Sequence, residues 1–140
     1  LCLYGQDMDE DISVMDAGLG WAVGKARRIG GEREGGFQGS ERTLAEFKGG
    51  AAWQRVGARS QTNRPVRSGT QIYAEEKATT VIGSVTSGSP APSVGCPVVM
   101  MRLTGKHKIL AGDVVWADVR GRRIALTICD MPFFAHRFER

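Results

Sequence analysis

Three clusters of basic residues are the part of this sequence best suited to hold a negatively charged ligand. They lie at residues 25–28, at residues 120–123 and at the end of the chain, where Arg137 and Arg140 stand. An arginine guanidinium presents paired, planar N–H donors that match a carboxylate or a phosphate. Each cluster is therefore a candidate anion site, although a single cluster of this kind is more often a solvated turn.

An acidic run at residues 7–11 resembles the start of a calcium loop without completing it. An EF-hand loop that begins at Asp7 requires glycine at its sixth position and glutamate at its twelfth. This chain has Ile12 and Gly18 at those positions. We therefore expect a solvated acidic turn here rather than a cation site.

Three glycines that follow come close to a dinucleotide-binding fingerprint. In the series Gly18, Gly20 and Gly24, the third glycine is one position late, and no strong strand precedes the first. A nucleotide loop is rejected on that ground. Glycine also allows a close backbone approach, and we expect these residues to let the chain pack tightly against Trp21 or a neighbouring strand.

The histidines and cysteines do not form a metal site or a nucleophile–base pair. His107 and His136 have no evident Ser or Cys partner, and both are expected at the surface, with His136 the better placed to touch a ligand. Cys2, Cys96 and Cys129 are odd in number, form no CxxC motif and lie far from zinc-ligand spacing. They are expected to be reduced thiols that pack as small apolar residues.

Composition limits the class of protein and its partners. The 140 residues are 41% hydrophobic and 24% charged, with a net charge of +4, which is typical of a globular chain. No apolar stretch approaches the ~18 residues that would span a bilayer, and the aromatic residues are not interleaved with basic ones as in nucleic-acid binders. Neither a membrane nor a nucleic acid is expected. The start has no initiator Met and no signal-peptide pattern, so we expect part of a longer protein.

The first fifty residues predict one helix within an incomplete domain. Ser40 is expected to cap the helix, Leu44 and Phe47 give it apolar i, i+3 spacing, and the pair Gly49 and Gly50 ends it. Two large apolar side chains over three turns make a thin stripe, so this helix needs a neighbour. We expect residues 1–50 to be the end of a larger domain.

Residues 51–140 predict a second domain, an antiparallel barrel of six strands. Short runs with period-two alternation are separated by turn signals, which is typical of small barrels or sandwiches. Arg120 and Gly121 fit a tight hairpin. The expected strands are residues 54–58, 71–74, 79–86, 97–103, 113–119 and 122–129.

Nine segments of this chain form an ordered series: residues 1–10, 17–25, 36–39, 55–57, 65–69, 82–88, 92–93, 118–121 and 131–133. Taken in this order, they resemble one family, the glycine cleavage T-proteins or aminomethyltransferases. The family usually has Pro-Val-Glu before Ala17, where this chain has Val14, Met15 and Asp16, and Phe138 stands at a position that is often Tyr.

The resemblance implies an α+β fragment dominated by β structure: a six-stranded barrel (51–140) preceded by the C-terminal end of a folate-binding domain (1–50). It implies transfer of a one-carbon unit from the aminomethyl-lipoyl H-protein to tetrahydrofolate, with release of ammonia. Tetrahydrofolate is a co-substrate, and no metal or redox cofactor is expected. The family resides in the bacterial cytoplasm or the mitochondrial matrix.

The resemblance also implies that this chain supplies only some of the residues of the active site. The family's catalytic Asp and main folate-binding residues lie ahead of Leu1, so no catalytic residue is assigned here, and the isolated chain is expected to be inactive. The expected folate-site rim consists of Tyr4, Trp21, Lys25, Arg137 and Phe138. Ordinary core packing of Tyr4 and Trp21 is the competing interpretation. We expect Trp21 to be partly exposed.

Three alternatives remain open at this point. Sarcosine- and dimethylglycine-oxidising enzymes and a folate-binding iron–sulfur assembly factor have a similar C-terminal architecture, although residues 20–25 favour the T-protein. A basic barrel that binds RNA or a protein without catalysis is the second alternative. The third is a folded fragment that binds nothing by itself.

Overall fold

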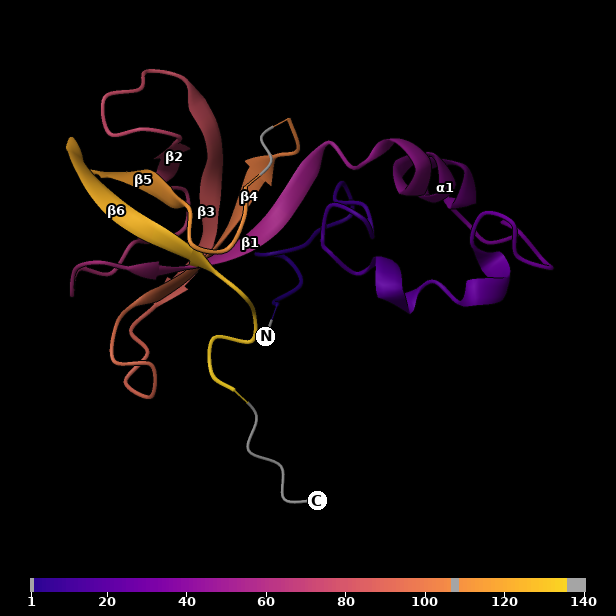
Figure 1. Cartoon of the computed structure of the whole chain (residues 1–140), viewed down its shortest axis with the longest axis horizontal. Helices are drawn as coiled ribbons and strands as arrows, with labels where there is room; N and C mark the ends of the chain where they lie inside the picture. The colour runs from indigo at the N-terminus through magenta and orange to yellow at the C-terminus, as the bar shows by residue number, and fades with distance from the viewer. Residues whose placement is uncertain (1, 107–108, 136–140) are drawn as a thin grey trace.

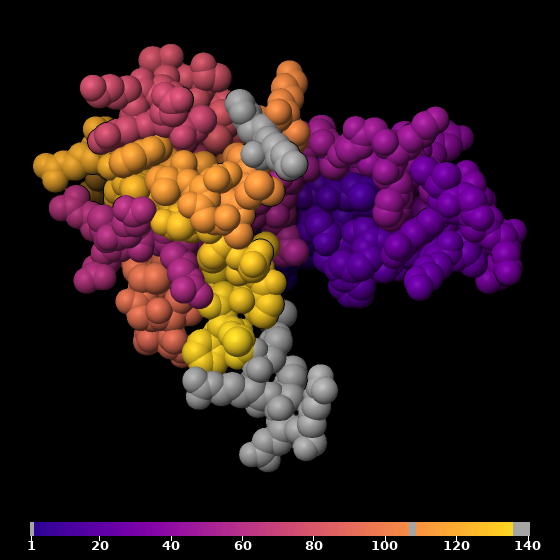
Figure 2. Space-filling view, in the orientation of Figure 1, coloured from indigo at the N-terminus to yellow at the C-terminus, as the bar shows by residue number. Residues whose placement is uncertain are grey.

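A computed structural model describes residues 2–106 and 109–135 of the chain. Residues 2–50, here called the N-terminal lobe, lie to one side of a β-barrel that occupies the rest (Figure 1). The lobe contains two short 3-10 helices, η1 (Gly20–Ala22) and η2 (Lys25–Arg27), and one α-helix, α1 (Ser40–Gly49). In the space-filling view the lobe projects from the barrel as a separate mass (Figure 2).

The barrel is closed and has six strands, as predicted. Its order is β1-β4-β3-β2-β5-β6, and every neighbouring pair is antiparallel. Closure leaves no free strand edge, and the interior of a small barrel is filled by side chains. The strands are β1 (Trp53–Ser60), β2 (Gln71–Tyr73), β3 (Val81–Ser89), β4 (Val98–Thr104), β5 (Val114–Val119) and β6 (Arg122–Cys129).

Alternation along the strands builds the barrel core. In β6 the side chains of Ile124, Leu126 and Ile128 are buried while their neighbours are partly exposed. The core fills the interior with branched and sulfur-bearing side chains, which removes their apolar area from water. Its buried members are Ala58, Val66, Ile72, Ile82, Val85, Val99, Met101, Leu103, Val115, Ala117, Ile124, Leu126 and Ile128.

The hairpin between β5 and β6 has the predicted tight form. Val119 pairs with Arg122, which leaves Arg120 and Gly121 as a two-residue loop. Both have positive φ angles, 56° and 76°, as a type I′ turn requires. The right-handed twist of the strands favours this turn type.

Helix α1 lies where it was predicted, but the capping prediction was wrong. Gly39, in the left-handed region with a φ of 76°, is the N-cap, and no side chain caps the helix. Ser40 is already the first helical residue. The helix ends as predicted, since Gly49 is its last residue and the N–H of Gly50 donates to the carbonyl of Glu46 at 2.8 Å. A glycine at the N-cap offers backbone freedom in place of a hydroxyl acceptor.

The lobe has almost no core of its own. Among the described residues, Ala17 is the only hydrophobic residue of the lobe that is buried. Its exposed large hydrophobic residues are Leu3, Tyr4, Val14, Trp21 and Ile29. An apolar surface of this kind normally meets another surface.

Candidate functional site

The candidate site is the exposed aromatic surface of the N-terminal lobe. Tyr4 is 70% exposed and Trp21 is 76% exposed, so core packing does not explain either residue. The prediction that Trp21 is partly exposed is confirmed. Trp21 belongs to η1 and Lys25, also exposed, begins η2. Large aromatic side chains gain most from burial or stacking, so their exposure here favours a binding role.

The structure brings Trp21 and Lys25 into one local unit but places Tyr4 in a different segment. Tyr4 lies in the first turn of the lobe, where it forms an isolated bridge with Met8. Trp21 and Lys25 lie on the consecutive helices η1 and η2. The other two predicted rim residues, Arg137 and Phe138, and also His107 and His136, lie outside the described residues.

Arg28 holds the backbone that carries Trp21. Its Nε donates to the carbonyl of Val23 at 2.8 Å, and its Nη2 donates to the carbonyls of Gly20 at 3.3 Å and Trp21 at 3.1 Å. Its guanidinium also lies 5.5 Å from the ring centroid of Phe47 in α1. One arginine therefore joins η1 to the helix. Arg28 and η1 are therefore the neighbours against which Phe47, part of the thin apolar stripe of α1, packs.

The basic cluster at residues 25–28 is therefore mainly structural. Arg27 Nη1 donates to the carbonyls of Arg33 at 3.3 Å and Gly35 at 3.0 Å, while Arg28 is used as described above. Both guanidiniums point at backbone carbonyls, which corrects the interpretation of these two arginines as a solvated turn or an anion site. Lys25 is exposed, and it forms no ion pair with any of the described residues.

The glycine series allows close packing at Gly20 and brings Gly18 beside Arg55 of strand β1, whereas a side chain at Gly24 would meet nothing within 4 Å. A side chain at Gly20 would come within 2.7 Å of Met15 Sδ and 3.5 Å of Phe47 Cζ. Glycine at position 20 therefore lets η1 pack against Met15 and α1 rather than against Trp21 or a strand.

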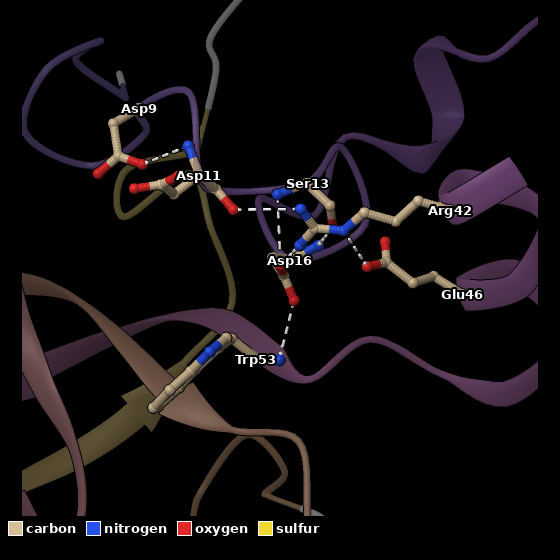
Figure 3. Close-up of polar contacts among 7 residues, drawn as sticks. All are labelled: Asp9, Asp11, Ser13, Asp16, Arg42, Glu46 and Trp53. Carbon is tan, nitrogen blue, oxygen red and sulfur yellow. Dashed lines mark hydrogen bonds and ion pairs between the residues drawn. The ribbon is translucent and has the colours of Figure 1, made fainter. Parts of the chain in front are cut away.

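A buried carboxylate, Asp16, joins the lobe to the barrel (Figure 3). Asp16 is 2% exposed. Its Oδ1 accepts from the backbone N–H of Trp53 at 2.9 Å, and its Oδ2 accepts from Arg42 Nη2 at 3.1 Å and from the Ser13 N–H at 3.3 Å. The Asp16 N–H in turn donates to Ser13 Oγ at 2.9 Å. A buried carboxylate needs such donors to offset its lost hydration.

Arg42 completes this junction from α1. It reaches Glu46 through Nε at 2.9 Å and the carbonyl of Asp11 through Nη1 at 3.3 Å. The hydrogen bond to Glu46, and then the charges of Glu46, Asp16 and Asp11, raise the pKa of the Arg42 guanidinium. The helix, the acidic loop and the first strand thus share one polar network. From the sequence, Asp16 is notable only as a departure from the family pattern.

Asp7 forms a second junction and corrects part of the acidic-turn prediction. It is 4% exposed, whereas Asp9 and Asp11 are exposed as expected. Asp7 Oδ1 accepts from the hydroxyl of Thr86 in β3 at 2.6 Å, and Oδ2 accepts from the Leu3 N–H at 3.0 Å. The turn that carries Tyr4 is therefore attached to the barrel wall rather than solvated. A hydroxyl partner 79 positions away could not be read from the sequence.

Arg55 of β1 is a half-buried cation where the N-terminal lobe meets the barrel. Its guanidinium contacts the Cys2 sulfur, and its Nε is buried and has no hydrogen-bond partner within the described part of the chain. Burial lowers the pKa of this guanidinium. A side chain at Gly18 would stand 3.8 Å from Arg55 Nη2, so the lobe backbone passes directly over the cation.

Metal binding and membrane spanning find no support among the described residues. Within residues 2–106 and 109–135, no three His, Cys, Asp or Glu side chains gather as metal ligands would. The same part of the chain has no helix with the length and apolarity of a membrane span. All three cysteines are free and half-buried.

A family comparison decides the relationship of the barrel to known proteins. Residues 54–135 match the glycine cleavage T-protein C-terminal barrel domain. The chain belongs to the T-protein barrel family. That match covers β1 to β6, and the resemblance expected from the sequence is confirmed.

Other members of the T-protein family are similar to this chain in the N-terminal lobe as well as in the barrel. A Flaveria trinervia protein named aminomethyltransferase, mitochondrial, is 38% identical over 139 residues, which is 99% of this chain and 32% of that protein. A probable mitochondrial aminomethyltransferase of Schizosaccharomyces pombe is 37% identical over 134 residues, 95% of this chain and 32% of that protein. The chain thus spans about a third of the length of these relatives.

A solved structure shows the same arrangement. The crystal structure of glycine cleavage system aminomethyltransferase T from Bartonella henselae superposes with a TM-score of 0.86 at 34% identity. It covers 100% of this chain, and the chain covers 37% of it. The lobe and the barrel together, rather than the barrel alone, therefore resemble that T-protein.

Proposed function

We propose that this chain is the C-terminal part of a tetrahydrofolate-dependent aminomethyltransferase of glycine cleavage. The whole protein would transfer the one-carbon unit from the aminomethyl-lipoyl arm of the H-protein to tetrahydrofolate and release ammonia. The barrel family match and the relatives' names support this reading over a folate-dependent oxidase, an iron–sulfur assembly factor or a non-enzymatic binding module.

One observation carries the proposal at the level of residues: Trp21 is exposed, yet Arg28 holds the backbone that carries it. The lobe has almost no core, and Trp21 is exposed on a helix whose carbonyls are bonded to Arg28. Disordered aromatic side chains would lose entropy on binding a ligand, whereas a fixed backbone lowers that cost. We infer that residues 1–50 are the end of a folate-binding domain and residues 51–140 a barrel domain that supports it.

The proposed roles follow the chemistry of folate. Tyr4 and Trp21 would stack on its flat pterin and benzoyl rings, which is worth ~0.5–1.5 kcal/mol beyond area burial. Lys25 would meet the glutamate carboxylates near the opening, and Arg137 and Phe138 would add to the rim from the chain terminus. The reactive carboxylate would come from the remainder of the protein. The chain alone is therefore expected to release no ammonia from the aminomethyl-lipoyl H-protein.

The proposal also gives a partner and a compartment. The lipoylated H-protein of the same system would deliver the aminomethyl group. Relatives in Flaveria trinervia and Schizosaccharomyces pombe carry mitochondrial names, which supports the mitochondrial matrix. The bacterial cytoplasm is the other compartment that the family resemblance implies.

A chimera tests the function directly. This chain would replace the matching 37% of aminomethyltransferase T from Bartonella henselae. Circular dichroism and gel filtration establish folding, and ammonia release is measured with aminomethylated H-protein in the presence and absence of tetrahydrofolate. We expect folate-dependent release from the chimera and none from the isolated chain. A folded chimera without activity, or activity of the isolated chain, would contradict the proposal.

A further inference from the structure

A basic surface lies on the side of the barrel away from α1. The loop at residues 61–70 and the β5–β6 hairpin border a cavity of about 780 Å³. In Figures 1 and 2 both segments lie at the left edge of the barrel, with the N-terminal lobe at the right. The lining residues are Arg64, Pro65, Arg67, Thr70, Asp118, Val119, Arg120 and Arg122. Four arginines from two distant parts of the sequence therefore meet around one hollow.

The single acid that lines this arginine pocket is already engaged. Asp118 Oδ2 lies 3.4 Å from Arg123 Nη1, and Asp118 Oδ1 accepts from the Gly121 N–H at 2.8 Å. Arg123 packs with its guanidinium 3.3 Å from the ring centroid of Tyr73 and does not line the pocket. Among the described residues, none of the four lining arginines forms an ion pair. Their mutual repulsion would be relieved by an anion between them.

The loop side of the pocket is anchored by the barrel core. Val66 is completely buried between Arg64 and Arg67 in the sequence. Its carbonyl lies so near Gly88 that any side chain there would clash with it, at 1.9 Å. The Thr70 hydroxyl donates to the carbonyl of Arg67 at 2.7 Å. The loop thus holds its arginines on a fixed backbone.

The hairpin side carries an arginine at a position that disfavours it. Arg120 has a φ of 56° and is the only described non-glycine residue with a positive φ. Asn, Asp and Gly are the preferred residues at this position of a type I′ turn, because a left-handed conformation is sterically unfavourable for other residues. Residues held at such a cost are found where they serve binding or catalysis. A guanidinium that binds a ligand would offset this cost.

We propose that the arginine pocket binds a small, multiply charged anion of the phosphate class. A single carboxylate would leave most of the positive charge unpaired, whereas an oligophosphate presents several charges within a volume typical of small-molecule pockets. None of the described residues that line the pocket is aromatic, so they offer no platform for the base stacking on which single-stranded nucleic acids depend. This site is independent of the proposed folate surface on the lobe.

Isothermal titration calorimetry of the whole chain with inorganic tripolyphosphate tests the proposal. The substitutions Arg67→Gln and Arg120→Asn are each expected to weaken binding about tenfold. Arg33→Gln is the matched control, because Arg33 is an exposed arginine of the lobe outside the pocket, and it is expected to leave binding unchanged. Arg120→Asn should also raise the Tm by roughly 3 °C, since Asn suits the turn.

Three results would overturn the proposal. The first is no saturable binding of tripolyphosphate to the folded chain. The second is equal binding by Arg67→Gln, Arg120→Asn and Arg33→Gln, since the anion would then bind elsewhere. The third is tighter binding of a polyglutamate peptide or single-stranded DNA than of tripolyphosphate, which would make the pocket a docking surface for a macromolecule. A fall in binding together with a higher Tm in Arg120→Asn separates lost contacts from lost folding.

Discussion

The backbone N–H of Trp53, the first residue of β1, donates to Asp16 Oδ1 at 2.9 Å across 37 positions of sequence. This bond joins the lobe to the barrel at the point where the barrel begins. Arg42 and Ser13 supply the remaining donors to the same carboxylate (Figure 3). The position of the aromatic surface relative to the barrel therefore depends strongly on one buried aspartate.

Replacing Asp16 with alanine is expected to lower the free energy of unfolding by about 2–4 kcal/mol. The substitution leaves the Trp53 and Ser13 N–H groups without their buried acceptor, and unsatisfied buried donors are costly. Urea denaturation followed by circular dichroism measures the change. Asp9→Ala is the control, because Asp9 is exposed and, among the described residues, its side chain accepts only from the Asp11 N–H. Equal stability of the two variants would show that the Asp16 network contributes little.

The Asp7–Thr86 bond gives a second, more local prediction. Thr86→Val keeps the side-chain shape but removes the hydroxyl that donates to Asp7 Oδ1, at a cost of about 1–2 kcal/mol. The first turn of the lobe should loosen, and amide exchange of the Leu3 N–H, which donates to Asp7 Oδ2, should accelerate. Thr127→Val, which removes a partner of Gln61 elsewhere, should leave Leu3 exchange unchanged. Unaltered exchange in Thr86→Val would contradict this account of the junction.

Arg28→Lys tests whether one guanidinium fixes the helix that carries Trp21. A lysine ammonium cannot reproduce the planar set of donors that contacts Val23, Gly20 and Trp21, so we expect a loss of about 1 kcal/mol. The near-ultraviolet circular dichroism of the lobe should weaken as well. Arg33→Lys, the control, should change neither the stability nor the near-ultraviolet spectrum. An unchanged spectrum in Arg28→Lys would mean that other contacts hold η1.

Cys129 gives a prediction for the dependence of stability on pH. Burial raises the pKa of this thiol above its ordinary value, and the charge of Arg59 nearby opposes the shift. Because the folded-state pKa is raised, the thiol ionises first in the unfolded state. The stability that the protonated thiol contributes is therefore fully present below its ordinary pKa near 9.0. That stability is lost as the pH rises through the higher pKa of the folded state.

The comparison of wild type with Cys129→Ala isolates this effect. Urea unfolding under reducing conditions is measured from neutral pH upward, and the stability difference between the two proteins is plotted against pH. We expect a constant difference below the ordinary thiol pKa and a declining one above it. A difference that stays constant, or that grows in favour of the wild type at high pH, would contradict the raised pKa.

The barrel was predictable because its signal is local. Alternation in β5 and β6 and the hairpin at Arg120 and Gly121 depend on residues close in sequence, and the structure confirms them. The six expected strand positions correspond to β1 to β6, with ends that differ by up to three residues. Period-two patterning and turn chemistry determine such elements.

The polar junctions were not predictable because their partners are distant in sequence. Asp7 looked like one of several acids in a solvated run, and only the fold places Thr86 beside it. Arg28 looked like a free cation, and its backbone acceptors depend on the path of the loop. The arginine pocket is a further case, since Arg64 and Arg67 join Arg120 only after the barrel closes.

The most direct test of the account is the effect of Trp21 on the use of tetrahydrofolate by the chimera. Trp21→Ala is compared with Ile29→Ala, the control, because Ile29 is also an exposed apolar residue of the lobe, 51% exposed. Both variants should keep their stability within about 0.5 kcal/mol. Trp21→Ala should raise the KM for tetrahydrofolate roughly tenfold through lost stacking and burial, while Ile29→Ala should not change it. The same KM in Trp21→Ala, Ile29→Ala and the unsubstituted chimera would contradict the claim that this lobe forms a wall of the folate site.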